Sequence, residues 1–314
     1  MIIYSIIIPH YKVPKLLIRC LESIPQRDDV QVIVVDDNSP DADTYLERFP
    51  ELNRPNLEFI RTTEGKGAGY ARNVGLKHAK GKWILFADAD DFYCPGFLDI
   101  LDEYRESDLE ILYFNTLSVN SDTLLSGRNR AAIGQQIIGA YDGSGITADN
   151  VRFFVFGVWN KMFSLNFVRR YNLTFAELPK GNDQRFVLLA SYFAKKWVID
   201  KRALYTLTFR KGSITYSRMT KEKYLADFEI WSCRAKLYDY MGHPEWNENC
   251  CRGYRYSDCL YKCKKKYEKK PNVGKLMYRI YFTHWLSIKW KSYSYVRIIK
   301  QIEKEIKKNI KNEI

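Results

Sequence analysis

The sequence has 314 residues, enough for one large domain or for one domain with an accessory segment. Hydrophobic residues make up 46% and charged residues 28%, which is typical of a globular protein. No stretch approaches the roughly 18 uninterrupted apolar residues of a membrane-spanning helix. The first apolar run, residues 2–9, is too short for a secretory signal, and the seven Cys are an odd number. We therefore expect a cytoplasmic protein with reduced thiols.

The net charge of +13 is concentrated at the C-terminal end of the chain. Residues 262–314 contain 16 Lys or Arg and four Glu, a net charge of +12, which leaves +1 for the preceding 261 residues. A basic tail of this kind favours an anionic surface such as nucleic acid, anionic lipid or another polyanion.

Strand-like and helical patterns alternate over the first 115 residues. Short runs rich in Ile, Val and Phe predict strands at 2–9, 30–36, 57–61, 82–88 and 109–115, and helical stretches between them fall at 13–23, 43–48, 69–79 and 95–105. Pro95 is a residue suited to the first turn of the last of these helices. This alternation predicts an α/β domain with parallel strands that helices cover on both faces.

The pattern changes after residue 115. Residues 116–150 are rich in Ser, Gly, Asn and Asp, and we expect loops with a small hairpin there. Helices are predicted at 183–195 and 221–240, with a strand at 202–210 between them. From about Gly242 the pattern is mostly helical and is broken at Pro271.

Acidic residues follow two of the predicted strands. Asp36 and Asp37 end the second strand, and Asp88, Asp90 and Asp91 end the fourth. Because ligands of open parallel sheets bind beyond the carboxyl ends of the strands, these carboxylates are expected at one edge. Such a cluster repels itself unless a cation compensates, and hard oxygen ligands suit Mg²⁺ or Mn²⁺. Helix capping or turn formation is the alternative for any single Asp.

A glycine-rich segment, residues 64–75, lies between the two acidic groups and leads into a predicted helix. It offers main-chain N–H groups to an anion, and Arg72 adds a charge that can contact phosphate. Its spacing is neither that of a P-loop nor that of a dinucleotide-binding fingerprint.

Three segments in this order, SIIIPHY, VIVVDDNS and GAGYARNVGLKHAKGKWILFADADD, resemble the nucleotide-sugar-binding half of glycosyltransferase family 2. The resemblance covers residues 3–115, and VWNKMF, GNDQRFVLLAS and FRKGSITYS are more loosely similar to the acceptor half. It implies a GT-A fold, an α/β/α sandwich. Residues 1–115 would form the nucleotide-sugar-binding half and residues 116–218 the acceptor-binding half. Residues 219–314 would then be a helical, basic C-terminal extension.

The resemblance also implies roles for individual residues. Pro9 and Tyr11 would line the base pocket, and Asp37 would accept a hydrogen bond from the base, which favours uracil. Arg72 would lie near the diphosphate, and Asp88 and Asp90 form the DxD motif that binds Mn²⁺ or Mg²⁺, with Asp90 as the better direct ligand. Asp183 would be the catalytic base. Arg210 and Ser213 would belong to a loop that closes over the diphosphate.

Two positions depart from the family pattern. Lys12 replaces the usual Asn after Tyr11, and Asn182 replaces the Glu that usually precedes the base. A carboxylate at the start of a helix is also favourable without any catalytic role, and this remains the alternative for Asp183. The loss of the acidic neighbour keeps open a second hypothesis, a non-catalytic protein that binds nucleotide sugar or a polyanion on the same fold.

The tail leaves two interpretations open. Apolar residues recur at helical spacing among Lys, Arg and aromatic residues, which fits a helix in an anionic membrane interface as well as an amphipathic helix packed on the protein. Zinc is a weaker possibility at His243, Cys250, Cys251, Cys259 and Cys263, because the four-residue spacing of Cys259 and Cys263 is unusual for it. A nucleic-acid binder is disfavoured by the near-neutral body of the chain.

The resemblance therefore implies an inverting, metal-dependent glycosyltransferase, and we expect it to act in bacterial surface polysaccharide assembly. Its donor would be a nucleotide-diphosphate sugar, with UDP favoured, and its acceptor a saccharide or a lipid-linked saccharide. The tail would contact the inner face of the plasma membrane peripherally, and no nucleic acid is expected as a partner.

Overall fold

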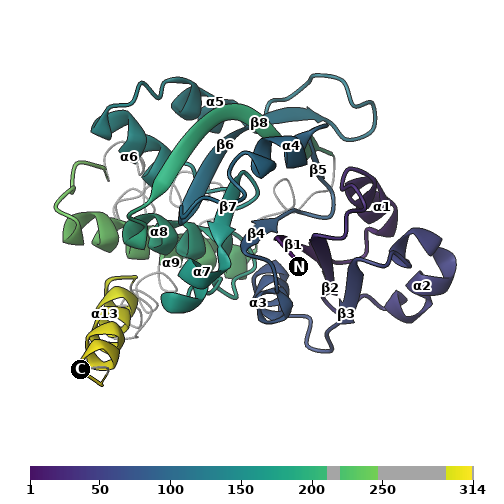
Figure 1. Cartoon of the computed structure of the whole chain (residues 1–314), viewed down its shortest axis with the longest axis horizontal. Helices are drawn as coiled ribbons and strands as arrows, with labels where there is room; N and C mark the ends of the chain where they lie inside the picture. Colours follow the sequence, from purple (N-terminus) through teal and green to yellow (C-terminus); the bar gives the residue numbers. More distant parts are fainter. Residues whose placement is uncertain (211–219, 247–294, 313–314) are drawn as a thin grey trace, which may run out of the picture. The chain divides into compact units, whose positions relative to one another are not determined.

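A computed structural model of the protein describes residues 1–210, 220–246 and 295–312. The chain divides into two compact units, Met1–Ser217 and Arg218–Ile314, which are described separately. All described strands belong to the first unit (Figure 1). None of the described helices combines the length and the apolar character needed to cross a membrane.

One sheet organises the first unit, and among the described residues it has eight strands in the order β3-β2-β1-β4-β7-β6-β8-β5 (Figure 1). Four neighbouring pairs are parallel, whereas β7 is antiparallel to β4 and β6, and β5 is antiparallel to β8. The predicted α/β class with a mostly parallel sheet is confirmed. The strands are β1 (Tyr4–His10), β2 (Val30–Asp36), β3 (Leu57–Arg61), β4 (Trp83–Phe86), β5 (Phe92–Tyr93), β6 (Ile111–Asn120), β7 (Lys161–Ser164) and β8 (Trp197–Phe209).

The first half of the unit forms as its apolar runs predict. Every residue of β1, β2 and β4 is buried, so these strands are covered on both faces. Helix α1 (Pro14–Glu22) connects β1 to β2 and buries Leu17, Cys20 and Leu21. Short helical turns, η1 (Ala42–Thr44), α2 (Tyr45–Arg48) and η2 (Pro50–Leu52), precede β3, and α3 (Ala68–His78) precedes β4. The parallel register from Tyr4↔Val30 to His10↔Asp36 brings the carboxyl ends of β1 and β2 level.

The second half differs from the sequence prediction. The expected loops of residues 116–150 are wrong, because β6 continues to Asn120 and two helices follow, α5 (Ala132–Gly139) and α6 (Gly145–Phe154). Ser144 caps α6 by accepting a hydrogen bond from the Thr147 N–H, so the polar residues there mark a helix start. Helix α4 (Phe97–Asp102) begins two residues after Pro95, which is not in its first turn. Helices α7 (Leu165–Arg170) and α8 (Asp183–Phe193) complete this half.

The second unit contains two described helices, α9 (Lys221–Tyr240) and α13 (Tyr295–Asn312), which pack on each other. The α13 side chains Ile299 and Ile302 are buried, and the Lys300 ammonium lies 5.7 Å from the centre of the Tyr240 ring.

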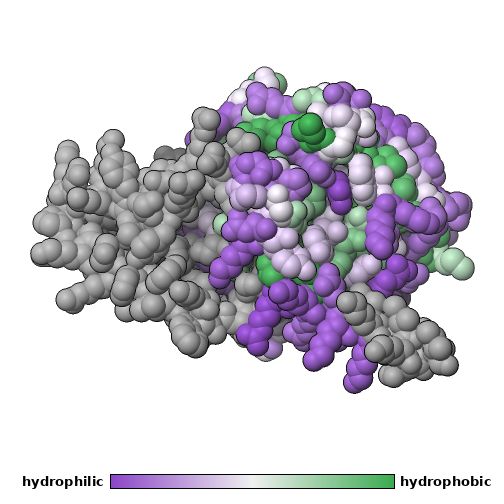
Figure 2. All heavy atoms as spheres, turned by 90° about the vertical axis from the view of Figure 1, so that its left-hand side faces the viewer, coloured by the Kyte–Doolittle hydropathy of each residue, from purple (hydrophilic) through white to green (hydrophobic). Residues whose placement is uncertain are grey.

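On the face drawn in Figure 2, hydrophilic residues predominate among the coloured atoms and apolar residues form small separate groups. The proposed zinc cysteines from Cys250 to Cys263 lie outside the described residues.

The close approach of Gly81 to β1 yields a stability prediction. A Cβ at Gly81 would lie 2.7 Å from the Ser5 main-chain N and 2.8 Å from the Ile3 O, and strand backbone cannot move aside easily. We expect Gly81→Ala to lower the free energy of unfolding by about 1–3 kcal/mol, as overpacking does. Urea unfolding measures this. Gly139→Ala is the matched control, because nothing lies within 4 Å of its Cβ position, and equal stability of the two variants would contradict the prediction.

Candidate active site

The acidic residues after β2 have two different environments. Asp36 points into the protein, where its Oδ2 lies 2.7 Å from His10 Nδ1 and its carboxylate also accepts hydrogen bonds from the Ser39 N–H and Oγ. Burial raises the pKa of Asp36, but the hydrogen bonds from His10 and Ser39 outweigh it and leave the pKa below its ordinary value. Asp36 is therefore a structural carboxylate that fixes the end of β1 against the end of β2.

Asp37 holds the glycine-rich segment in place. Its Oδ2 accepts a hydrogen bond of 2.6 Å from the Gly67 N–H, directly before α3, where Gly67 has a φ of 91°. Its Oδ1 is buried and has no hydrogen-bond partner within the part of the chain that the structure describes. An unpaired buried carboxylate oxygen is costly, so Asp37 is suited to accept a hydrogen bond from a ligand.

The residues that follow β1 line the same edge of the sheet. Pro9 is buried and pairs with Val35, whereas Tyr11 is 51% exposed and its ring is free to contact a ligand on the solvent side. Lys12 has a positive φ of 55°, a conformation that Asn adopts more readily, and its N–H donates to Ser39 Oγ. The Lys12 ammonium lies 4.8 Å from the centre of the Tyr11 ring.

Three carboxylates gather after β4. One oxygen from each of Asp88, Asp90 and Asp91 lies within 4.8 Å of the others. The side chains of Asp88 and Asp90 are 30% and 22% exposed, whereas Asp91 is fully buried. Asp91 Oδ1 accepts from the Thr208 N–H, but its Oδ2 is buried and unpaired among the described residues. The main-chain O of Asp90 accepts hydrogen bonds from the Arg19 and Thr208 side chains, which fix the turn.

The electrostatics of this group fit a hard divalent cation. Burial and then the charge of Asp88 raise the pKa of Asp90, although Arg210 and Arg130 act in the opposite direction. Burial and the charges of Asp90 and Asp88 raise the pKa of Asp91 well above its ordinary value. Clustered oxygen ligands that repel one another, one with an unpaired oxygen, are the donor set that Mg²⁺ or Mn²⁺ stabilises.

Arg72 links this group to the start of α8. Its guanidinium is 5% exposed and donates to Asp88 Oδ1 at 2.5 Å and to Asn182 Oδ1 at 2.7 Å. Asp183 is the first residue of α8 and follows Asn182 directly. Burial raises the pKa of Asp183, and the charge of Asp88 adds to this, whereas Arg72 and Lys161 lower it. The structure thus brings Asp88, Arg72 and the start of α8 together across 110 residues of sequence.

The last two predicted site residues follow β8. The Arg210 Nε donates to Asp90 Oδ2 at 3.3 Å, which places the guanidinium beside the acidic group. Ser213 lies outside the described residues.

Comparison with known proteins settles the family. Residues 5–166 match glycosyl transferase family 2, which is more than half of the chain. The chain belongs to this family.

Two curated relatives illustrate the similarity. Glycosyltransferase GlyA of Streptococcus pneumoniae is 26% identical over 259 residues, which cover 76% of this chain and 35% of GlyA. The poly(ribitol-phosphate) beta-N-acetylglucosaminyltransferase TarS of Staphylococcus aureus is 27% identical over 220 residues, which cover 67% of this chain and 36% of TarS. The matched region thus spans about a third of the length of these relatives.

Solved structures of two sugar transferases share the fold. The crystal structure of TarS residues 1–349 in complex with UDP-GlcNAc superposes with a TM-score of 0.55 at 23% identity, covering 75% of this chain and 66% of that one. The mannosyltransferase PcManGT of Pyrobaculum calidifontis, in complex with GDP-Man and Mn²⁺, gives a TM-score of 0.54 at 13% identity and covers 94% of this chain and 84% of that one. These likenesses establish the GT-A architecture.

Sequence reasoning assigned no role to Lys161, a buried residue close to the site. It is fully buried at the start of β7, and its ammonium donates to the main-chain O of Val155 and of Gly157 and to Asn160 Oδ1. Burial lowers the pKa of Lys161 to about 7, although Asp183 opposes this shift. The VWNKMF segment that resembles the family contains this residue, but a lysine in a short apolar run gives no sign that it turns inward.

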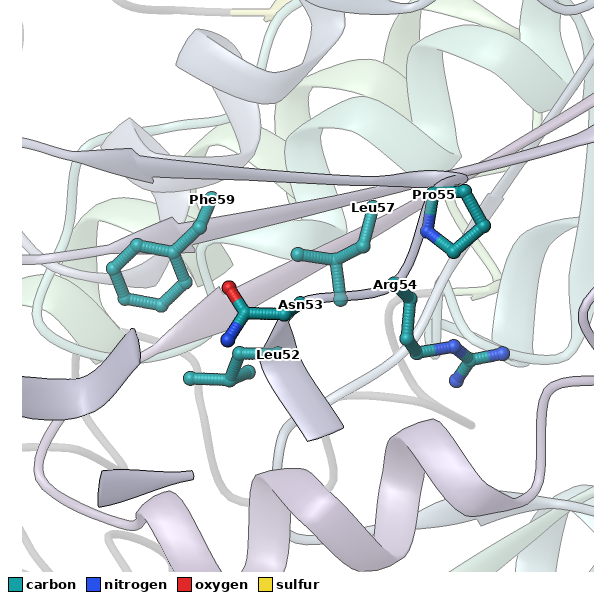
Figure 3. Close-up of a pocket in the computed structure, with 6 residues that line it drawn as sticks. All are labelled: Leu52, Asn53, Arg54, Pro55, Leu57 and Phe59. Atoms are coloured by element: carbon teal, nitrogen blue, oxygen red, sulfur yellow. The ribbon is translucent and has the colours of Figure 1, made fainter. Parts of the chain in front are cut away.

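A separate pocket of about 410 Å³ lies beside β3 at the edge of the sheet (Figure 3). None of the carboxylates after β2 or β4 lines it, and its walls are of mixed polarity. It is therefore not the candidate active site. Its lining residues are Leu52, Asn53, Arg54, Pro55, Leu57 and Phe59.

The bridge made by Arg72 yields a second prediction. Lysine has one compact ammonium and cannot reproduce the two-sided contact of a guanidinium. We expect Arg72→Lys to lower the free energy of unfolding by about 1–3 kcal/mol, the range for buried hydrogen bonds to charged groups. Denaturant unfolding measures this. Arg48→Lys, at an exposed ion pair with Asp41, is the control and should change stability little. Comparable losses in both variants would refute a special role for Arg72.

Proposed function

We propose that the chain is an inverting glycosyltransferase that moves a sugar from a nucleotide-diphosphate sugar to an acceptor hydroxyl. One observation carries this proposal: Arg72 ties the carboxylates after β4 to the start of α8, where Asp183 lies. A cation-binding group and a candidate base are thereby held on one site. Membership of glycosyl transferase family 2 supports the same activity.

A uridine diphosphate sugar fits the residues beyond β1 and β2 best. The unpaired Oδ1 of Asp37 is suited to accept a hydrogen bond from an imide N–H such as that of uracil, and the exposed ring of Tyr11 is suited to stack on a base. The TarS structure in complex with UDP-GlcNAc supports this choice of nucleotide, although PcManGT was solved with GDP-Man. Pro9 would complete the base pocket from β1.

A divalent cation would be held by Asp90 and Asp88. When bound, it would neutralise charge on the diphosphate as the sugar departs. Arg210 pairs with Asp90 and would contact the same leaving group, and Ser213 would follow it in the closing loop. The complex of PcManGT with Mn²⁺ supports Mn²⁺ as the ion, and Mg²⁺ has the same ligand preference.

Asp183 would act as general base. It would take the proton of the acceptor hydroxyl while the oxygen attacks the anomeric carbon, and the bond from that carbon to the diphosphate oxygen would break on the opposite face. Burial raises the pKa of Asp183, and a base with a pKa nearer the operating pH transfers protons more effectively. The positive charges of Arg72 and Lys161 limit this rise and keep the carboxylate available as an acceptor.

The proposed setting is bacterial surface polysaccharide assembly at the inner face of the plasma membrane, with a saccharide or lipid-linked saccharide as acceptor. The second half, residues 116–218, would bind this acceptor. Burial of Ile299 and Ile302 within the second unit supports the packed alternative for α13 over insertion into an interface. The exposed Lys300, Lys304 and Lys308 would then contact anionic lipid through charge alone.

Removal of the proposed base is the most direct test. We expect Asp183→Asn to reduce sugar transfer by about a hundredfold or more, the range for loss of a general base, and to leave UDP affinity unchanged. Turnover of a UDP-sugar panel and calorimetry with UDP measure the two effects. Asp99→Asn is the control, because Asp99 also lies in the first turn of a helix but is exposed. Wild-type turnover in Asp183→Asn would refute Asp183 as the base, whereas normal UDP binding without any turnover by the wild type would support the non-catalytic hypothesis.

Metal dependence gives a separate prediction. We expect Mn²⁺ to tighten UDP binding and Asp90→Asn to remove most of this effect, because the variant lacks the charge that the cation needs. Calorimetric titration of UDP with Mn²⁺ and with excess chelator measures it. Asp122→Asn, at an exposed position after β6, should behave as the wild type. Identical UDP affinity under both conditions in the wild type would exclude a metal-bound donor.

A further inference from the structure

Trp159 lies at the edge of the sheet where the site is built. Strand β7 runs antiparallel to β4 with Trp83 opposite Ser164 and Ile84 opposite Phe163. Continued past the start of β7, this register brings Trp159 level with Asp88. The start of an antiparallel strand lies beside the carboxyl ends of the strands next to it. A residue just before β7 therefore reaches the edge of the sheet where the residues just after β4 lie.

Aromatic contacts confirm this placement. The Trp159 ring stacks on Tyr205, with centroids 5.7 Å apart and planes inclined by 13°. The Tyr205 hydroxyl in turn accepts a hydrogen bond of 2.8 Å from the Asp88 N–H. One buried tyrosine thus separates the indole from the main chain of the DxD motif.

The segment that carries Trp159 is fixed from both ends. The buried Lys161 ammonium bonds the main chain at Val155 and Gly157, and Asn160 Nδ2 donates to Phe114 O. A Cβ at Gly157 would lie 2.4 Å from the indole Cζ2, so only glycine admits the ring in this position. The protein places a lysine side chain in its interior to hold this one short segment, which suits a rigid contact surface.

The indole also retains an unused polar group. Trp159 is half-buried, and its N–H makes no hydrogen bond to any residue in the described ranges. The indole nitrogen is also not one of the buried, unpaired polar atoms of the described ranges, so it remains accessible to a ligand. A tryptophan this close to the core usually satisfies its N–H within the protein. Tyr205 and Gly157 cover part of the ring, and its exposed remainder offers an apolar surface with a donor at the rim.

We propose that Trp159 is the platform on which the pyranose ring of the acceptor saccharide stacks, an inference that rests on the function proposed above. A pyranose has an apolar C–H face and a rim of hydroxyls, which match the indole ring and its N–H. The acceptor is favoured over the donor sugar because Trp159 lies in the second half, two residues from Lys161, whose charge acts on Asp183. In the proposed function the diphosphate contacts the cation held by Asp90 and Asp88, and Arg210 beside it.

Saturation-transfer NMR tests this proposal on the full chain with UDP and Mn²⁺ present. The probes are methyl glycosides of glucose, galactose, mannose and N-acetylglucosamine, together with ribitol, a polyol without a ring. We expect the C–H protons of at least one pyranoside to receive saturation from the wild-type protein. Trp159→Leu should weaken that binding about tenfold, the upper range for an aromatic contact, whereas Trp159→Phe should retain much of it.

Trp197→Leu is the matched control and should bind the probes as the wild type does. Trp197 is also half-buried but begins β8, at the opposite edge of the sheet from Asp88. Calorimetric affinity for UDP verifies that each variant is folded and separates the two hypotheses. If UDP fails to bind the wild type, the proposed function fails. If UDP binds normally, the platform is refuted by a silent pyranoside panel, by saturation of ribitol alone, or by equal signals from Trp159→Leu and the wild type.

Discussion

Mutual repulsion among the carboxylates after β4 is the constraint on which the site depends. Three carboxylate oxygens within 4.8 Å of one another cannot all stay charged without compensation. The protein supplies part of this compensation. The Arg72 guanidinium donates a hydrogen bond to Asp88 and the Arg210 guanidinium donates one to Asp90, while the Thr208 N–H donates to Asp91. Arg72 comes from α3, whereas Thr208 lies at the end of β8 and Arg210 directly follows it, so the cluster can form only when both halves of the sheet are assembled. The remaining imbalance is what a divalent cation would relieve.

The same constraint explains why the two halves of the first unit meet as they do. Arg72 comes from α3, in the half that would bind nucleotide, and Asn182 precedes α8, in the half that would bind the acceptor. The buried guanidinium needs partners on both sides because an unpaired buried charge is strongly unfavourable. The contacts of Arg72 with Asp88 and Asn182 therefore hold the start of α8 in place and also set the geometry of the proposed reaction.

The sequence predicted the first half well because β1, β2 and β4 are buried on both faces and therefore appear as continuous apolar runs. The prediction failed for residues 116–150. Gly134 and Gly139 lie within α5 although glycine disfavours helices, and Ser144, which is typical of loops, is the N-cap of α6. In the site, the DxD motif was visible because its spacing is local. The partners of Arg72 and the inward turn of Lys161 were not, since they depend on residues brought together by the fold over distances that no periodic pattern records.

The replacement of the usual Glu by Asn182 takes on a different meaning in this geometry. The amide Oδ1 accepts the Arg72 hydrogen bond that a carboxylate would accept, so the start of α8 is held in place without a second negative charge beside Asp183. Another carboxylate there would raise the pKa of Asp183 further, because like charges disfavour ionisation. With Asn182, the guanidinium charge is shared between Asp88 and Asp183 alone. The departure from the family pattern therefore favours an ionised Asp183, the form in which it can accept a proton.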